Sequence, residues 1–239
     1  MRAPWAQVDP VADYLYHKLV DSDLDFLVSA VLAAEQVPSL EEVCTYERVF
    51  GLTRDECKQF LRETLSLETA GHQLARQSFH VIAYKGKPVA CCSAWIEAAD
   101  GQPSGLKVAM ILSRFLGTSR WRAHASSVSV VASCSPKRTA GALQLETFFV
   151  EPQHRRNGMT GQLIEYAIVE HSNASSAPEH AEITLFRENE QAARAYVRAG
   201  FELVWETTID TASLESLTAS KGFLQLRRSL AIVESARNA

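Results

Sequence analysis

The chain has 239 residues and a formal net charge of −4, and this length is enough to bury one full hydrophobic core. Hydrophobic residues make up 46% and charged residues 22% of the sequence, which is ordinary for a soluble globular protein. The acidic balance argues against binding to nucleic acid or to an anionic membrane, because such binders carry a basic excess.

Five cysteines, an odd number, show neither a CxxC motif nor a Cys/His ligand spacing, so we expect reduced thiols and no metal site. Reduced thiols in turn favour a cytoplasmic protein. No apolar run reaches the roughly 18 residues of a membrane span, and the N-terminus lacks the apolar core of a signal peptide. Without a repeat or a long linker, residues 1–239 are predicted to form a single domain.

The first third of the chain is predicted to hold a strand followed by helices. Residues 14–20 fit either a first strand or the start of a helix. Asp23 is a helix cap ahead of an apolar stripe over residues 24–32, and Pro38 ends that helix. Two capping boxes then begin further helices: Ser39-x-x-Glu42 and Thr53-x-x-Glu56.

Two strands joined by a tight turn follow, at Phe79–Tyr84 and Pro88–Ile96. The second is apolar over nearly its whole length, so we expect a central strand that is covered on both faces. We interpret His80 in the first strand as a structural histidine, with a catalytic role as the alternative.

Residues 98–140 form a long connection before the next strand. The pattern predicts a loop over 98–105, a helix over 106–116 that Gly117 ends, and a strand over 126–133. A connection of this length is either an embellishment on the sheet edge or a wall of a substrate pocket. It contains a basic and aromatic cluster: Arg114, Arg120, Trp121, Arg122 and His124.

Residues 143–168 give the most informative pattern, a strand over 143–150, a polar turn over 151–157, and a helix that starts after Gly158. The first N–H groups of a helix have no partner within the helix, and together with the helix dipole they form a site for phosphate. Gly158 would let a ligand approach the backbone, because glycine has no Cβ.

Three more strands and a helix complete the predicted chain. Ala181–Phe186 reads as a strand, Asn189–Ala199 as a helix that Gly200 ends, and Phe201–Thr207 and Phe223–Leu230 as further strands. This alternation predicts a mixed α/β sheet with helices on its faces.

Two motifs in this order resemble one known family. Val150-x-Pro152-x-x-Arg155-x-x-Gly158-x-Thr160 resembles the acyl-coenzyme A-binding loop of the GNAT N-acetyltransferases, although that family usually has Gly or Ala where Thr160 stands. Asn189-x-x-Ala192-x-x-x-Tyr196-x-x-x-Gly200-Phe201 resembles the helix and strand that close the coenzyme site from its far side. On these two motifs the chain is identified as a member.

The resemblance implies the GNAT fold, a mixed and mainly antiparallel central sheet flanked by helices. It makes residues 98–140 an insertion before the coenzyme-binding strand. It also implies that acetyl-CoA is the co-substrate and that the acetyl group passes directly to a primary amine, on a small molecule or a peptide. A non-catalytic acyl-CoA-binding module and a transferase of longer acyl groups are the alternatives, and a homodimer stays open.

The resemblance also assigns residues to the site. Tyr196 stands where the family keeps a tyrosine that protonates the departing sulfur, the alternative being a core aromatic. Glu146 is the candidate base; it shares a strand face with Gln144 and Phe148 unless a bulge shifts the phase. The residues expected to bind the coenzyme are Phe149, Val150, Arg155, Arg156, Asn157, Gly158, Met159, Thr160 and Asn189.

The basic cluster of the insertion leads to a hypothesis about the acceptor. In this sheet plan the insertion lies near the acceptor end of the cleft, where an arginine such as Arg120 would pair with an anion. We therefore hypothesise an acceptor that carries a carboxylate or a phosphate besides its amine. The alternative is that these arginines face solvent or pair with acidic residues of the first helices.

Overall fold

Seven strands form one sheet in the order β1-β2-β3-β4-β5-β7-β6. The computed structural model describes residues 14–17, 19–36, 43–172, 177–208 and 212–230. Strands β4 and β5 pair in parallel, and the other neighbouring strands pair antiparallel. The strands are β1 Tyr14–His17, β2 Phe79–Tyr84, β3 Lys87–Ile96, β4 Leu143–Val150, β5 His180–Phe186, β6 Glu202–Glu206 and β7 Phe223–Ser229. The prediction of a mixed, mainly antiparallel sheet is confirmed.

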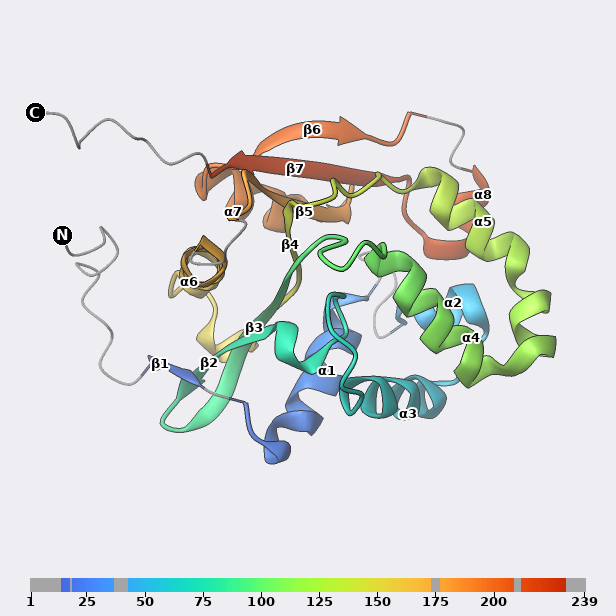
Figure 1. Cartoon of the computed structure of the whole chain (residues 1–239), viewed down its shortest axis with the longest axis horizontal. Helices are drawn as coiled ribbons and strands as arrows, with labels where there is room; N and C mark the ends of the chain where they lie inside the picture. The colour runs from blue at the N-terminus through green and yellow to red at the C-terminus, as the bar shows by residue number, and fades with distance from the viewer. Residues whose placement is uncertain (1–13, 18, 37–42, 173–176, 209–211, 231–239) are drawn as a thin grey trace, which may run out of the picture.

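Helices cover both faces of this sheet. Helix α1 packs on β4 and β3 and is backed by α3, while α6 lies across β2, β3 and β4 on the opposite face and contacts α7. Figure 1 shows α1 to α5 and α8 on one side of the sheet, with α6 and α7 on the other. The helices are α1 Leu24–Ala34, α2 Thr45–Phe50, α3 Arg54–Leu65, α4 Ser104–Ala123, α5 Ala125–Cys134, α6 Met159–Ser172, α7 Glu190–Arg198 and α8 Ala212–Thr218.

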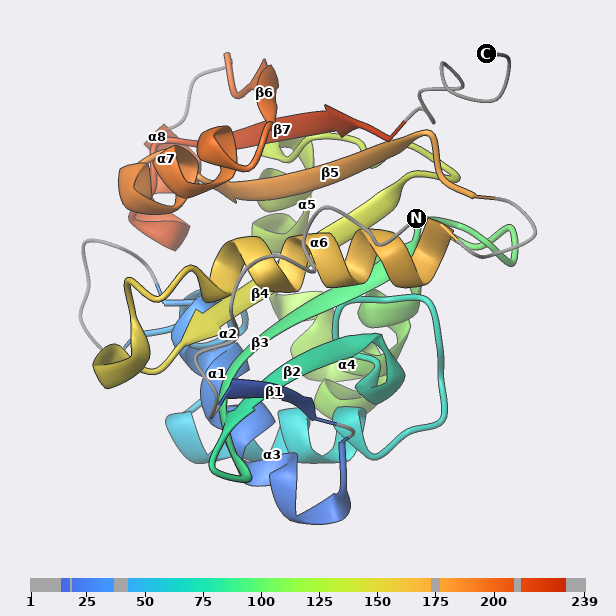
Figure 2. The same ribbon diagram turned by 90° about the vertical axis from the view of Figure 1, so that its left-hand side faces the viewer.

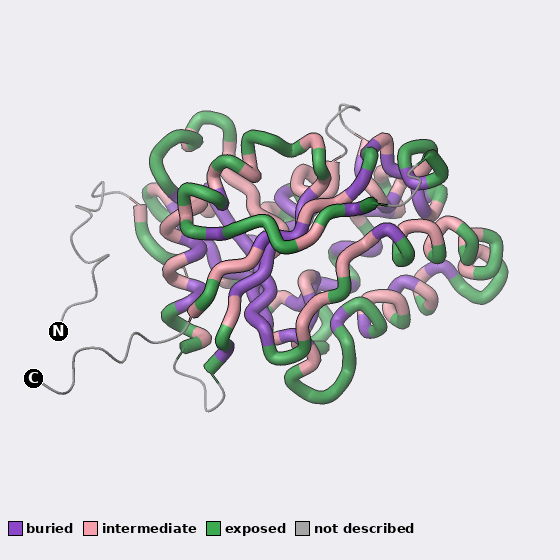
Figure 3. The backbone as a smooth tube through the Cα atoms, turned by 90° about the horizontal axis from the view of Figure 1, so that it is seen from above, coloured by how far each residue is buried: buried purple, intermediate pink, exposed green. Residues whose placement is uncertain are grey.

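The predicted capping box at Thr53 is confirmed, whereas Asp23 precedes α1 without a capping hydrogen bond from its side chain. Thr53 accepts a hydrogen bond from Glu56 N and the Glu56 carboxylate accepts one from Thr53 N, which closes the capping box of α3. The α3 stripe then buries Phe60 and Leu61 completely. Strand β3 is buried on both faces from Val89 to Trp95, as predicted. Figure 3 shows these buried segments in the middle of the molecule, with exposed turns around them.

Residues 126–133 are helical, so the prediction of a strand there was wrong. The partly buried positions of this segment fall at Ser127, Val128, Val130 and Val131, and Cys134 is buried, which is the i, i+3, i+4, i+7 spacing of one helix face. This face packs against α8, α2 and α4 rather than against a strand. Packing between helices therefore overrides the β preference of the valines.

Other expectations near the insertion and the termini have mixed outcomes. Gly117 breaks α4 with a φ of 74° and a ψ of 164°, so the predicted helix end is confirmed even though a second helical segment follows directly. Residues 14–17 are a strand, which settles the alternative at the N-terminus. Helix α8 was not predicted. Pro38 and the Ser39 capping box lie outside the described residues. The N-cap of α2 is Cys44, and the Glu47 side chain accepts a hydrogen bond from the Cys44 backbone N–H to close a capping box. None of the described helices is long and apolar enough to cross a membrane.

Candidate active site

Strand β4 carries a bulge in its middle. Cys91 pairs with Phe149 and Ser93 pairs with Glu146, so two residues of β4 stand opposite one residue of β3. Thr147, inside the bulge, has a φ of 54°, a conformation that a β-branched residue rarely adopts. Such strain persists only where the surrounding structure enforces it, and it often marks a functional site.

The bulge changes which side chains share a face of the sheet. Leu145 and Phe148 both pack in the core on the α6 side, whereas Phe149 packs on the α1 side. Gln144 and Glu146 alternate with Leu145 and therefore face the α1 side. The bulge thus separates Glu146 from Phe148, which simple alternation would have placed on the same face.

Beyond the bulge, β4 and β5 diverge. Their pairing is limited to Leu143 with Ala181 and Gln144 with Glu182, and Figure 2 shows the strands spreading apart toward the start of α6. Glu182 holds the junction, since its carboxylate accepts hydrogen bonds from Gln144, from Thr139 and from Arg227. Burial acts to raise the pKa of Glu182, but these hydrogen bonds hold it below its usual range. A charged anchor therefore fixes the closed end of the opening between the two strands.

The predicted coenzyme loop connects the open end of β4 to α6. Gly158 has a φ of 75°, and a Cβ placed there would meet open space. The first hydrogen bond of α6 runs from Gln162 N to Gly158 O at 3.1 Å, which leaves the preceding N–H groups of Met159, Thr160 and Gly161 at the helix start. These donors and the helix dipole are the elements of a phosphate site.

Some polar side chains of the loop form hydrogen bonds within it, and others face solvent. Arg155 donates from Nε to Val150 O at 3.0 Å, and Asn157 donates to His154 O at 3.2 Å. Arg156 is exposed and has no ion-pair partner among the described residues. Asn189 caps α7, where its side-chain oxygen accepts a hydrogen bond from Ala192 N at 3.3 Å. Arg156 is accordingly the cation of this loop that is left open to a ligand.

Tyr196 lies on the α6 side of the bulge. Its ring packs against Phe148 at 5.2 Å and Phe201 at 6.5 Å between centroids, and its side chain is buried. Its hydroxyl makes no hydrogen bond with a described residue. Burial, and then the charges of Cys92 and Glu146, raise the pKa of Tyr196 well above its usual value. This phenol therefore keeps its proton at neutral pH.

Glu146 lies on the α1 side of the bulge and is paired with an arginine. Arg138 donates to Glu146 Oε1 from Nε at 3.1 Å and from Nη2 at 2.5 Å. The guanidinium also lies 5.4 Å from the centre of the Trp95 ring, and its Nη1 donates to Ser104 Oγ at 3.3 Å. Burial acts to lower the pKa of Arg138, whereas Glu146 and then Glu97 and Glu35 raise it above its usual value, so the guanidinium stays charged.

A second carboxyl group, Glu35 at the C-terminal end of α1, completes the α1 side of the site. Burial and the charge of Glu146 raise the pKa of Glu35 to about 7, against the opposing effects of Thr45 and Arg138. The ring of Tyr46 is buried beside it, and the charges of Glu35, Cys44 and Glu146 add to the burial that raises the pKa of Tyr46. Sequence reasoning missed both Glu35 and Arg138. Only the position of Arg138, in the turn that leads into β4, gave a signal.

The comparisons with known proteins agree with this geometry. A sequence model of the acetyltransferase (GNAT) family matches residues 45–201. The chain belongs to the GNAT acetyltransferase family. No curated protein matches the chain by sequence.

Solved GNAT structures share the fold at low sequence identity. An N-acetyltransferase from Staphylococcus aureus Mu50 is 13% identical with a TM-score of 0.58, over 89% of this chain and 99% of that one. A polyamine N-acetyltransferase from Drosophila melanogaster is 14% identical with a TM-score of 0.54, over 91% of this chain and 100% of that one. An agmatine N-acetyltransferase in its apo form is 15% identical with a TM-score of 0.54, over 91% and 100%.

Two residues of the basic cluster in the insertion, Arg120 and Trp121, make contacts within the protein. Arg120 pairs with Glu56 of α3 at 2.7 Å and also donates to Gly51 O, while Trp121 stacks on Phe50 at 6.4 Å. The hypothesised pairing of Arg120 with an anionic acceptor therefore competes with an ion pair inside the protein. The residue that the insertion does bring to the bulge is Arg138.

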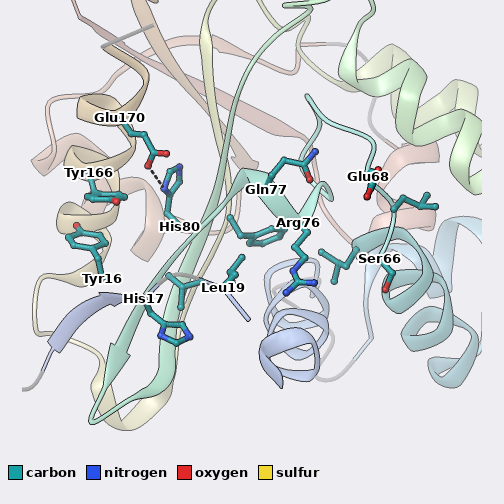
Figure 4. A pocket seen from close by; sticks show the side chains of 14 residues that line it. Tyr16, His17, Leu19, Ser66, Glu68, Arg76, Gln77, His80, Tyr166 and Glu170 are labelled. Atoms are coloured by element: carbon teal, nitrogen blue, oxygen red, sulfur yellow. Dashed lines mark ion pairs between the residues drawn. The ribbon is translucent and has the colours of Figure 1, made fainter. Parts of the chain in front are cut away.

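His80 and its surroundings also lie apart from the bulged strand. His80 belongs to a cavity of about 970 Å³ between β1, β2, the end of α3 and α6. Figure 4 shows His80 Nδ1 facing Glu170 at 3.3 Å and Tyr16 stacked on Tyr166. Burial, and then His171, lower the pKa of His80 to about 4, so at neutral pH this contact joins a neutral imidazole to a carboxylate. None of the expected coenzyme or catalytic residues lines this cavity.

The described residues also hold no group of three or more His, Cys, Asp or Glu side chains that could bind a metal ion.

Proposed function

We propose that this GNAT protein transfers an acetyl group from acetyl-CoA directly to a primary amine, within a ternary complex. The observation that carries this proposal is the placement of Tyr196 and Glu146 on opposite faces of β4, at the bulge where β4 leaves β5. A thioester lying at this bulge would have a proton donor on one side and carboxylates on the other. Acetyl transfer to an ammonium ion needs both groups.

The coenzyme would enter along the opening between β4 and β5. Its pyrophosphate would be held by the N–H groups at the start of α6 and by Arg156, and Gly158 would let the backbone come close. Backbone groups at Phe149 and Val150 would orient the pantetheine arm, because the edge of β4 that faces β5 is open beyond Gln144. Asn189 would contribute through the cap that fixes α7, and with it Tyr196.

The transfer itself follows from these positions. The amine nitrogen attacks the carbonyl carbon of the thioester, the carbon–sulfur bond then breaks, and its electron pair stays on sulfur. Tyr196 gives its hydroxyl proton to that sulfur, and solvent returns a proton to the phenolate as the new amide nitrogen loses its own. Because the acetyl group arrives already activated, holding the two reactants in this geometry supplies much of the rate.

The α1 side of the site favours a cationic acceptor. Glu35, Glu97 and Glu146 outnumber the single cation Arg138 around this part of the strand, so an ammonium ion would be attracted to it. Two of the structures similar to this chain are of enzymes named for agmatine and for polyamines, which are also cationic amines. We therefore place small primary amines first among the candidate acceptors, ahead of acceptors that carry an anionic group.

A thiol-release screen tests this function. Purified protein is mixed with acetyl-CoA and a panel of amines that includes polyamines, amino acids and peptides, and free coenzyme A is measured as the product. We expect release that depends on an amine, with small cationic amines the most active. Tight binding of acetyl-CoA without release from any amine would indicate a non-catalytic binding module, and release only from longer acyl-CoA thioesters would indicate a different acyl donor.

A further inference from the structure

Glu35 stands out as an ionisable group without a compensating partner. It is partly buried, and no Lys, Arg or His of the described residues forms an ion pair with its carboxylate. Its backbone carbonyl, by contrast, is fully used, accepting hydrogen bonds from Thr45 N at 2.9 Å and from Thr45 Oγ1 at 3.1 Å. The backbone of Glu35 is thus fixed, while its carboxylate is stabilised only by the Thr45 side chain and the charge of Arg138, which do not offset the effects of burial and of Glu146.

The position of Glu35 is also unfavourable for a purely structural carboxylate. It is the C-cap residue of α1, where the helix dipole places partial negative charge. A negative side chain at this end destabilises the helix, and a lysine or arginine would be the stabilising choice. A carboxylate that is held in such a place without a cation is characteristic of a functional site.

Glu35 shares its surroundings with the reacting strand. Helix α1 packs directly on β4, and the groups that act electrostatically on Glu35 or on its neighbour Tyr46 come from every element around it. These groups are Cys44 and Tyr46 at the start of α2, Cys57 on α3, Arg138 before β4 and Glu146 on β4, and Glu97 acts on Arg138.

The carboxylates of Glu35, Glu97 and Glu146, on the α1 side of the bulge, have different partners. Both hydrogen bonds that Glu146 receives from Arg138 fall on Oε1, and the guanidinium neutralises the charge of Glu146. Glu97 is likewise occupied, because it accepts hydrogen bonds from Trp95 Nε1 at 3.0 Å and from Ser104 N at 2.9 Å. Among the described residues, Glu35 has neither an ion-pair partner, which Glu146 has, nor hydrogen bonds from an indole and a backbone N–H group, which Glu97 has.

We propose that Glu35 is the residue that takes the proton from the acceptor's ammonium ion, while the Glu146–Arg138 pair holds that ion beside the bulge. This inference rests on the proposed function. In the step, one N–H bond of the ammonium breaks, its proton goes to a Glu35 oxygen, and the free amine keeps the electron pair with which it attacks the thioester. The proton later leaves Glu35 for solvent.

The raised pKa of Glu35 suits this task. A base with a pKa of about 7 is largely ionised just above neutral pH and still binds a proton well enough to remove it from an ammonium ion. Since the base must start deprotonated, kcat/KM should fall as the pH drops through about 7. A second limb at higher pH belongs to the acceptor's own ammonium group and is common to all variants.

Replacing Glu35 by glutamine separates a catalytic from a structural role. Glu35→Gln keeps the size and removes the titration, so we expect kcat/KM for the amine to fall by about 10²-fold or more and the limb near pH 7 to disappear. The Kd of acetyl-CoA should not change. Glu35→Asp, which retains a carboxyl group at a shorter reach, should lower the rate but keep the limb. Glu63→Gln on the exposed face of α3 is the matched control and should behave as wild type.

Glu146→Gln provides the contrast. It should raise the acceptor KM and keep the limb, displaced to lower pH, because Glu35 still titrates but the charge of Glu146 no longer raises its pKa. If Glu35→Gln keeps the limb and Glu146→Gln loses it, Glu146 is the base and the inference is wrong. If the wild-type protein turns over and the Glu35→Gln variant has the same pH profile of kcat/KM, the inference is wrong but the proposed function stands. A wild-type protein that releases no coenzyme A with any amine overturns the proposed function and this inference with it.

Discussion

At the scale of single residues, the site depends on one inserted residue in β4. Thr147 has a φ of 54°, and its insertion turns Phe148 toward Tyr196 while Glu146 stays on the side of α1. The residue types of the site were readable from the sequence, because Tyr196 stands in a recognisable motif. The position of the bulge could not be predicted from the sequence, because simple alternation places Glu146 and Phe148 on the same face of the strand.

Tyr196 can be tested as the acid by removing one oxygen. Tyr196→Phe keeps the ring that packs on Phe148 but removes the proton donor, so kcat should fall by about 10²-fold or more. The Kd of acetyl-CoA, measured by calorimetry, should stay the same. A folded phenylalanine variant with near-normal kcat would show that Tyr196 is only a core aromatic.

Arg138 can be tested through the stability of the protein. Its guanidinium compensates the charge of Glu146 in a partly buried pair, so Arg138→Met should lower the free energy of unfolding by about 1–3 kcal/mol at neutral pH. The double variant with Glu146→Gln should recover part of this loss, because no uncompensated charge remains. Urea denaturation gives the values, with Arg122→Met on the exposed surface as control. Equal losses in the single and double variants would rule out the charge as the cause.

At the scale of elements, the sequence predicts those features that depend only on residues close together in the chain. The α3 cap, the β2–β3 turn and the start of α6 after Gly158 depend on neighbouring residues, and all three are as predicted. Helix α5 was read as a strand because its valines favour strands, and the packing of α2 and α8 on it cannot be seen locally. Glu35 was missed for the same reason, since only the fold brings the end of α1 to β4.

The loop between β4 and α6 gives the prediction that belongs to this scale. Gly158→Glu places a side chain at a φ of 75° and a negative charge at the start of α6, so the affinity for acetyl-CoA should fall at least tenfold. Gly101→Glu is the matched control, because Gly101 has a φ of 82° and open space around it but lies in another loop. Calorimetry on both variants decides, and normal binding by a folded Gly158→Glu variant would move the coenzyme elsewhere.

At the scale of the whole molecule, the sheet lies between the two groups of residues that we propose to take part in the transfer. Helices α6 and α7 carry the coenzyme loop and Tyr196 on one face, and α1, α2 and the insertion bring Glu35, Tyr46 and Arg138 to the other. The insertion therefore contributes to the site through its last turn. Its long helices instead support α2 and α3.

The insertion's basic cluster should accordingly have little effect on substrate use. Arg120→Ala removes a solvent-exposed ion pair with Glu56, so only a small loss of stability is expected. The KM values of acetyl-CoA and of the amine should both stay within about twofold of wild type. A rise in the acceptor KM alone would restore the hypothesis that Arg120 binds an anionic group of the acceptor.

The most direct test of the account is the initial velocity measured while acetyl-CoA and an accepted amine are varied together. Direct transfer across the bulge requires both substrates to be bound at once, so double-reciprocal plots should give intersecting lines, and the N-acetylated amine should accumulate in step with coenzyme A. Parallel lines, which indicate an acetylated form of the enzyme that waits for the amine, would contradict the account.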